Sequence, residues 1–128
     1  MSTTTKLEDE SSCKYVKVSV DLNDALSVLG NARSVDIDAS AILELMCRCF
    51  LCRSDDAYFV LWKKYGSDIF DEALFDAFAF MREKLMLVFP GYKPYRDHIL
   101  FDDDCIETNK LGVFHIRMEE CVWELLRQ

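Results

Sequence analysis

Glycine and proline are scarce in this chain, whose 128 residues include four glycines and two prolines. This scarcity excludes a collagen-like or linker-like composition. Long apolar runs are also missing, because the longest stretch with few charges, Ala39–Cys52, still contains Glu44 and Arg48. A membrane-spanning helix needs about 20 apolar residues. We therefore expect no membrane span.

Catalytic signatures are missing as well. The sequence has no GxxxxGK(S/T), GxGxxG, GxSxG or HExxH pattern. These patterns are the common marks of phosphate binding, dinucleotide binding, serine hydrolysis and zinc proteolysis. We therefore predict a protein that is not an enzyme and has no catalytic residues.

Positive charge is in deficit, with 15 Lys and Arg against 23 Asp and Glu, and the net charge is −8. Proteins that bind nucleic acid or anionic membranes carry basic patches, so both partners are unexpected here. Hydrophobic residues make up 51% of the chain, which favours a folded protein over a disordered one. The length suits a single compact domain.

The N-terminal residues Met1–Ser12 are polar and include three adjacent acids, Glu8, Asp9 and Glu10. We expect a flexible acidic tail over residues 1–12 and one globular domain over residues 13–128. The tail lacks the apolar core of a signal peptide. Together with six cysteines in a chain rich in core-forming residues, this favours free thiols in a reducing intracellular compartment, cytoplasmic or nuclear.

Apolar periodicity and capping residues predict five helices. They cover Asp24–Leu29, Ala39–Arg53, Ser54–Tyr65, Ser67–Phe89 and Glu119–Gln128. The expected N-terminal caps are Asp38 or Ser40 for the second helix, Ser54 for the third and Ser67 for the fourth. Gly66 is expected to end the third helix, and the Pro90-Gly91 pair the fourth.

Alternating apolar and polar residues predict three strands, at Tyr15–Leu22, Asp97–Phe101 and Gly112–Met118. The last two are separated by the polar segment DDDCIETNK and could pair as a hairpin with a long loop. The expected fold class is α+β: a helix-rich single domain of four to five helices packed on a small antiparallel sheet. An all-α bundle is the alternative.

Three cysteines lie within six residues, in the pattern Cys47-x-Cys49-x-x-Cys52. With Cys105, Cys121 or a histidine they could hold zinc, so a zinc- or thiol-dependent protein is the alternative function. On a helix, however, Cys47 and Cys49 point to opposite sides, and only Cys49 and Cys52 share a face. Buried free thiols without metal or other cofactor are the favoured interpretation.

The chain has two histidines, His98 and His115. A small Cys/His enzyme, pairing His115 with Cys105 or Cys121, is a third hypothesis. The acidic run Asp102–Asp104 lacks the alternating ligands of a calcium loop, so it is interpreted as a solvated loop. We expect solvent-facing or satisfied histidines.

Aromatic residues are abundant, with nine Phe, five Tyr and two Trp. A domain this small cannot easily bury all of them, and surplus apolar surface often forms an interface or a helix-accepting groove. The candidate interface residues are Tyr58, Leu61, Trp62, Tyr65, Phe75 and Phe80. The sequence thus predicts a non-enzymatic intracellular interaction or regulatory module, self-associating as a homo-oligomer and of the kind that includes viral accessory proteins.

Overall fold

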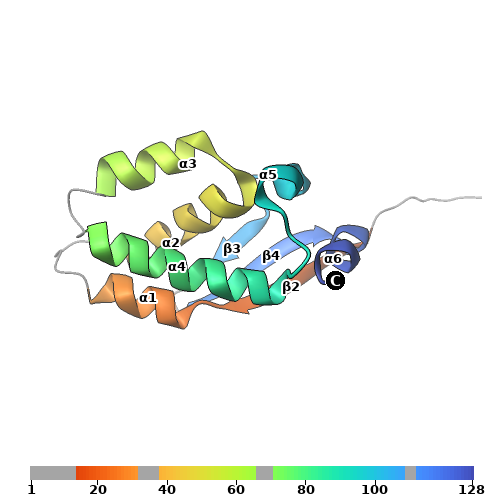
Figure 1. Cartoon of the computed structure of the whole chain (residues 1–128), viewed down its shortest axis with the longest axis horizontal. Coiled ribbons are helices and arrows are strands. Elements are labelled where there is room, and N and C mark those ends of the chain that lie inside the picture. The colour runs from red at the N-terminus through yellow and green to blue at the C-terminus, as the bar shows by residue number, and fades with distance from the viewer. Residues whose placement is uncertain (1–13, 32–37, 66–70, 109–111) are drawn as a thin grey trace, which may run out of the picture.

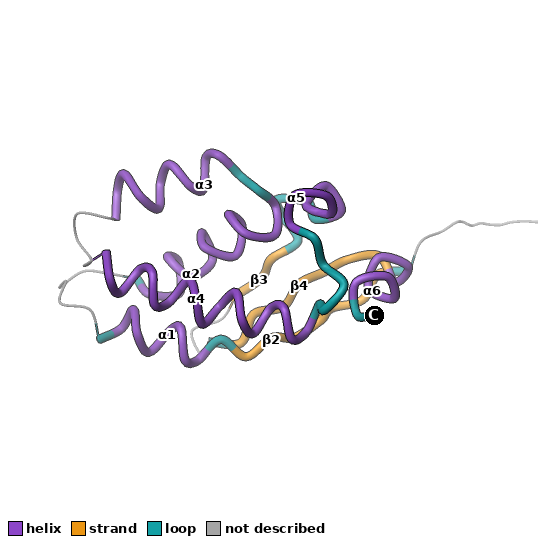
Figure 2. Tube along the Cα trace, viewed as in Figure 1, coloured by secondary structure: helices purple, strands orange, loops and turns teal. Residues whose placement is uncertain are grey.

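The computed structural model describes residues 14–31, 38–65, 71–108 and 112–128. Within these ranges the helices gather on one face of a small three-stranded antiparallel sheet (Figure 1). Figure 2 shows how much more of the chain is helix than strand. The predicted α+β class is confirmed. The expected tail over residues 1–12, the Ser67 cap and the helix end at Gly66 lie outside the described residues.

The sheet has the strand order β2-β4-β3, and both pairs are antiparallel. Its strands are β2 (Tyr15–Asp21), β4 (Val113–Glu119) and β3 (Ile106–Thr108). Ile116 in the central strand pairs with Val18 on one side and Ile106 on the other. Because side chains alternate along a strand, Phe114, Ile116 and Met118 are buried while the residues between them face outward.

The third strand is not where the sequence placed it. Asp97–Phe101, predicted as a strand, belongs mostly to a helical turn formed by α5 (Pro94–Asp97) and η3 (His98–Leu100). Pro94 has the fixed φ that suits a first helical position. The Asp97 carboxylate also accepts a hydrogen bond from the Lys93 backbone nitrogen, at 2.9 Å. These local signals outweigh a short apolar run. The edge strand is instead β3, in the segment interpreted as a loop.

The described residues form six continuous helical segments, one more than the four to five expected, because Pro94–Leu100 is helical. Besides α5–η3, the helices are α1 (Asn23–Gly30), α2 (Ala39–Cys47), η1 (Arg48–Cys52), α3 (Asp55–Phe59), η2 (Val60–Tyr65), α4 (Asp71–Val88) and α6 (Glu120–Leu126). Helix α2 continues into η1, and α3 continues into η2. Both η1 and η2 are π-helical, so each ends its helix with a wider turn.

Two of the predicted caps are confirmed. The Asp38 side chain accepts from the Ala41 backbone nitrogen, and the Ser54 hydroxyl accepts from that of Ala57, each at 3.2 Å. Side chains that accept in this way satisfy backbone donors that the first helical turn leaves without partners. The two caps fix where α2 and α3 begin, and therefore how these helices face α4.

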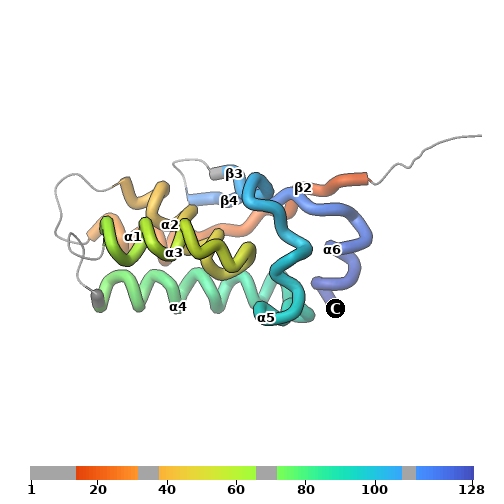
Figure 3. Tube along the Cα trace, turned by 90° about the horizontal axis from the view of Figure 1, so that it is seen from above, coloured from red at the N-terminus to blue at the C-terminus, as the bar shows by residue number. Residues whose placement is uncertain are grey.

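Helix α4 is the spine of the domain and runs along the sheet when the molecule is seen from above (Figure 3). Its inward side chains Leu74, Ala77, Met81 and Leu85 are fully buried. None of the helices in the described ranges combines the length and the apolar character that crossing a membrane requires.

Four rings form what we call the buried aromatic cluster: Phe50, Phe89, Tyr92 and Phe101. Their contacts have interplanar angles of 66° to 89°, an edge-to-face geometry that aromatic quadrupoles favour. None of the four is more than 7% exposed. The cluster joins η1 to the chain that follows α4, and it lies directly behind the groove described next.

Candidate functional site

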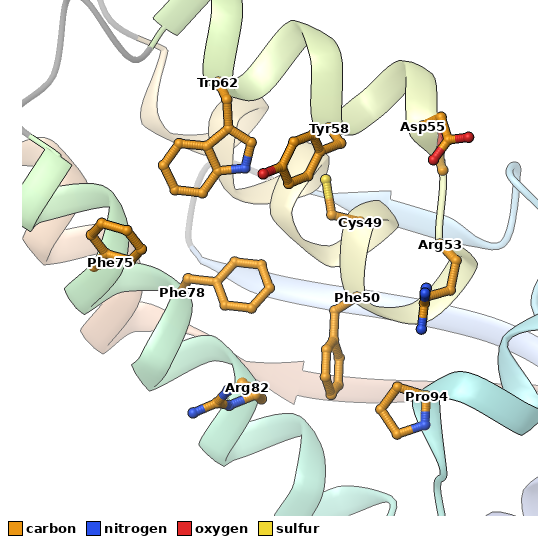
Figure 4. A pocket seen from close by; sticks show the side chains of 11 residues that line it. Cys49, Phe50, Arg53, Asp55, Tyr58, Trp62, Phe75, Phe78, Arg82 and Pro94 are labelled. Atoms are coloured by element: carbon orange, nitrogen blue, oxygen red, sulfur yellow. The ribbon is translucent and has the colours of Figure 1, made fainter.

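A groove with a cavity volume of about 650 Å³ lies between the α3–η2 helix and α4, with η1 at its floor (Figure 4). Figure 4 shows the rings of Trp62 and Phe75 toward one end, and Arg53 with Pro94 toward the other. Arg82 lies on the α4 wall. The groove therefore has an aromatic end, with Arg53 toward the other end and Arg82 on the α4 wall.

Three rings in mutual contact, which we call the groove triad, form the aromatic end: Tyr58, Trp62 and Phe75. The ring centroids of Tyr58 and Trp62 are 6.0 Å apart, and those of Trp62 and Phe75 are 5.6 Å apart. Tyr58 is 59% exposed and Phe75 is 64% exposed. Large apolar side chains gathered on the surface in this way are typical of a site that another molecule covers.

Arg53 enters the groove from an unusual backbone conformation. It ends η1 with φ 52° and ψ 44°, the left-handed region. For a residue with a Cβ this conformation costs roughly 1–2 kcal/mol, which is why helix ends of this kind usually carry glycine. Backbone strain of this type often accompanies functional sites.

The two arginines of the groove are not neutralised by neighbours. Within the described ranges neither Arg53 nor Arg82 forms an ion pair, although four other cationic side chains do. Both arginines are solvent-exposed. A guanidinium presents a planar fork of donors that matches a carboxylate. The groove can therefore offer bidentate hydrogen bonds to an incoming anion.

The groove floor is supported from behind by Tyr92, which is fully buried. Its hydroxyl lies 2.8 Å from the Phe50 carbonyl oxygen and 3.1 Å from that of Leu51, so it can donate to either. Burial raises the pKa of this phenol well above its usual range. The hydroxyl thus stays protonated as a donor and holds the π-helical turn that carries Phe50. Phe50 in turn contacts Phe78 on α4, with centroids 6.3 Å apart.

The structure brings together three of the six predicted interface residues, namely the members of the groove triad. Leu61 is a correction, since it is fully buried and belongs to the core. Four of the candidates, Tyr58, Leu61, Trp62 and Tyr65, have the spacing i, i+3, i+4, i+7, but their side chains cover both the inward and the outward side of α3–η2. Tyr65 is partly buried against the core. Phe80 is exposed but lines a separate depression beside Leu87, toward α1 and β2.

Sequence reasoning missed the two arginines and the floor residues Phe50 and Phe78. Arg82 follows Phe78 on α4 by four residues, so helical spacing could have placed both on the groove side. Arg53 carries no comparable signal. Neither glycine nor asparagine precedes or follows it to mark a left-handed turn.

The predicted cysteine cluster separates in the structure. Cys47 is buried in the core, Cys49 lines the groove, and the Cys52 thiol donates to the Asp102 carbonyl oxygen at 3.5 Å. Burial raises the pKa of Cys49 to about 11. Cys49 and Cys52 have different contacts, although they remain close enough for Cys52 to raise the pKa of Cys49. Of the three thiols in this segment, Cys52 is the one that lies beside Cys105 and shifts its pKa.

No three side chains of the metal-binding types gather closely enough to hold a metal ion in the ranges 14–31, 38–65, 71–108 and 112–128. The runner-up zinc set of Cys47, Cys49, Cys52 and Cys105 is therefore not assembled as a four-ligand group in this structure. The acidic residues Asp102–Asp104 are exposed.

The proposed Cys/His pairs also do not form. The Nδ1 atom of His115 is 2.9 Å from the Ser19 hydroxyl on the outward face of the sheet. Cys121 instead contacts Glu119, with 3.7 Å between sulfur and carboxylate oxygen. The other histidine, His98, bonds within its own helical turn to the Pro94 carbonyl at 3.1 Å.

Comparison with protein-family models, with curated proteins and with solved structures found no match to this chain. Three features distinguish the groove: its volume, the exposed rings of Tyr58 and Phe75, and its two arginines without ion-pair partners among the described residues.

Proposed function

We propose that this protein is an interaction module whose groove holds an apolar, carboxylate-bearing segment of a partner protein. The observation that carries the proposal is the combination, in one groove, of the triad, whose Tyr58 and Phe75 are exposed, with Arg53 and Arg82. Neither feature alone would define the partner. Together they favour a segment with bulky apolar side chains and an acidic side chain that reaches one of the two arginines.

The aromatic end supports an apolar anchor on the partner. Tyrosine, tryptophan and arginine are the residue types that most often dominate binding energy at protein interfaces. The triad supplies two of them, and the rings are already held by mutual contact, so little side-chain entropy is lost on binding. A cavity volume of about 650 Å³ accommodates several apolar side chains, as an amphipathic helix would present them.

The guanidinium groups support an acidic side chain on the partner. Charged hydrogen bonds between arginine and carboxylate are short and directional, and they fix orientation as well as adding affinity. Asp55 lies at the rim of the same groove. A partner lysine in place of that acidic side chain would meet a like charge at either arginine, with Asp55 as the one carboxylate among the groove residues.

The occupant is proposed to be a different protein rather than a second copy. Each copy carries a net charge of −8, so two whole copies repel one another at long range more strongly than one copy repels a segment with a single carboxylate. The self-association expected from the aromatic content remains a prediction. It would use the same exposed rings, so the same variants test it.

The test begins with a library of random peptides displayed on phage and selected on the purified protein. We expect selected peptides to combine aromatic or aliphatic residues with Asp or Glu. Each is then synthesised, and its dissociation constant is measured by fluorescence anisotropy. Phe75→Glu and Arg82→Glu should each weaken binding at least about tenfold, equivalent to about 1.4 kcal/mol.

Phe80→Glu is the matched control, because Phe80 is an exposed phenylalanine on the same helix but outside the groove. It should leave peptide affinity unchanged. Circular dichroism and thermal melting check that all three variants fold. Peptides that bind Phe75→Glu as tightly as the unaltered protein would refute the groove as the binding site.

Native mass spectrometry tests the second-copy alternative. A dimer that Phe75→Glu dissociates and Phe80→Glu preserves would show that the groove holds another copy, and it would replace our proposal. A monomer that binds the selected peptides supports the proposal. The same spectra report any bound zinc, the alternative raised by the cysteine cluster.

A further inference from the structure

Two cysteines that are far apart in the sequence meet at the end of η1. Cys52 is the last residue of η1, and Cys105 immediately precedes β3. The Cys52 sulfur lies 3.5 Å from the Asp102 carbonyl oxygen, and the Cys105 backbone nitrogen donates to that same oxygen at 3.0 Å. One carbonyl therefore holds both residues in place. The two thiols are close enough that each shifts the pKa of the other.

We propose that Cys52 and Cys105 form a reactive dithiol site, which small disulfides such as oxidised glutathione convert into an intramolecular disulfide. The inference stands apart from the proposed function, because neither its geometry nor its test involves a groove ligand. It also differs from the metal alternative, since only two of the four cysteines take part.

Cys52 is the attacking thiol. The neighbouring Cys105 side chain holds the pKa of the Cys52 thiol below its usual value, and the Arg48 guanidinium also lowers that pKa. A thiolate, not a thiol, attacks disulfides. Cys52 is partly exposed whereas Cys105 is only 2% exposed, so a small disulfide reaches Cys52 first.

The first step is attack of the Cys52 thiolate on one sulfur of the small disulfide. The new bond forms between Cys52 and that sulfur, and the other half leaves as a thiolate with the bonding electrons. The protein then carries a mixed disulfide at Cys52. The neighbouring Cys52 thiol is the largest cause of the raised pKa of Cys105. Once Cys52 is blocked, that cause is removed and the pKa of Cys105 falls.

In the second step Cys105 gives its proton to solvent and attacks the Cys52 sulfur, which releases the second small thiol. Overall, two protein thiols lose two protons and two electrons, and one small disulfide gains them to become two thiols. Cys121 is exposed on α6, where its nearest polar contact is Glu119. It should therefore stop at a mixed disulfide.

The experiment treats the full-length protein with oxidised glutathione and follows its intact mass, with non-reducing peptide mapping. We expect a loss of two hydrogen atoms and a crosslinked peptide pair containing Cys52 and Cys105. The crosslink should raise the melting temperature, because it restricts the unfolded chain between two distant positions. Added dithiothreitol should reverse both changes.

Two variants separate this site from general thiol oxidation. Cys105→Ser should abolish the intramolecular crosslink and trap glutathione on Cys52. The matched control Cys121→Ser should close the crosslink as the unaltered protein does. A crosslink between Cys49 and Cys52, or glutathione accumulating on Cys52 in the unaltered protein without closure, would overturn the proposal.

Discussion

The molecule contains two aromatic assemblies with similar distances between neighbouring rings and different exposure. Neighbouring rings in the buried aromatic cluster have centroids 5.4 to 6.0 Å apart, and those in the groove triad 5.6 to 6.0 Å apart. Yet no ring of the cluster exceeds 7% exposure, whereas Tyr58 and Phe75 of the triad are more than half exposed. Ring contact alone therefore does not identify a core.

The difference lies in how much apolar area leaves water. Burial stabilises a fold by roughly 25 cal/mol per Å² of apolar surface, so a fully enclosed ring contributes far more than a half-exposed one. The triad leaves that stabilisation unrealised in the free protein. A partner that covers the triad would gain it as binding energy, which is the physical link between the exposed rings and the proposed docking.

The largest expected effect comes from truncating one ring in each assembly. Phe89→Ala removes a fully buried ring and should lower the free energy of unfolding by about 3–5 kcal/mol. Phe75→Ala should lower it by less than about 0.5 kcal/mol, as for other surface substitutions. Urea denaturation followed by circular dichroism measures both. Equal losses would mean that the triad is a second core and not a docking surface.

A smaller effect is expected where the buried cluster supports the groove. Tyr92→Phe keeps the ring but removes the hydroxyl that reaches the Phe50 and Leu51 carbonyl oxygens. Leaving a buried acceptor without its donor costs about 1–3 kcal/mol. Urea denaturation should show that loss. Tyr58→Phe is the matched control on the exposed assembly and should be close to neutral, so a similar loss in both variants would contradict this role for Tyr92.

The stability contributed by the helical turn α5–η3, which carries Asp97, should respond to acid. The Arg96 guanidinium and the Lys93 backbone nitrogen hydrogen-bond to the Asp97 carboxylate, and they hold the pKa of Asp97 below its usual value. A pKa lower in the folded than in the unfolded protein gives stability that is complete above about pH 4 and lost as pH falls further. Asp97→Asn should cost about 1 kcal/mol at neutral pH, the scale of one hydrogen bond.

The check on that prediction is the pH dependence of chemical denaturation. The gap between Asp97→Asn and the unaltered protein should narrow as pH falls below about 4, because protonation removes the charge that the substitution has already removed. Asp103→Asn, in an exposed position, is the control and should leave the curve in place. A constant gap down to acid pH would assign the effect to packing instead of charge.

Local signals in the sequence predicted much of the fold. Asp38 and Ser54 cap the helices that they were expected to cap, since a cap is a contact within four residues. The strand at residues 106–108 was missed because three residues are too few to show an alternation, and its position depends on pairing with β4.

The candidate site was predictable only in part. Helical spacing identified Tyr58 and Trp62 as neighbours, because they are four residues apart on one helix. It could not place Phe75 beside them, since that contact depends on how two helices pack. Nor could it find Arg53, whose left-handed backbone follows from the way η1 ends and not from a residue type that prefers it.

The smallest expected effect has the opposite sign and bears most directly on the groove. Arg53→Gly should raise the free energy of unfolding by about 0.5–1 kcal/mol, because glycine adopts φ 52° without the Cβ clash, less the extra entropy of glycine in the unfolded chain. It should also weaken the selected peptides about tenfold, as a lost charged hydrogen bond would. Urea denaturation and fluorescence anisotropy measure the two effects.

Arg53→Ala separates the side chain from the backbone in that experiment. It removes the guanidinium but keeps a Cβ in the left-handed conformation, so affinity should fall as in Arg53→Gly while stability does not rise. If both variants were equally stabilised, strain at this backbone position would not be the cause. If stability rose only with glycine and affinity fell with both variants, Arg53 would occupy a strained position because the groove needs its charge. The groove would then be a surface shaped for binding, in contrast to the buried aromatic cluster, which is shaped for stability.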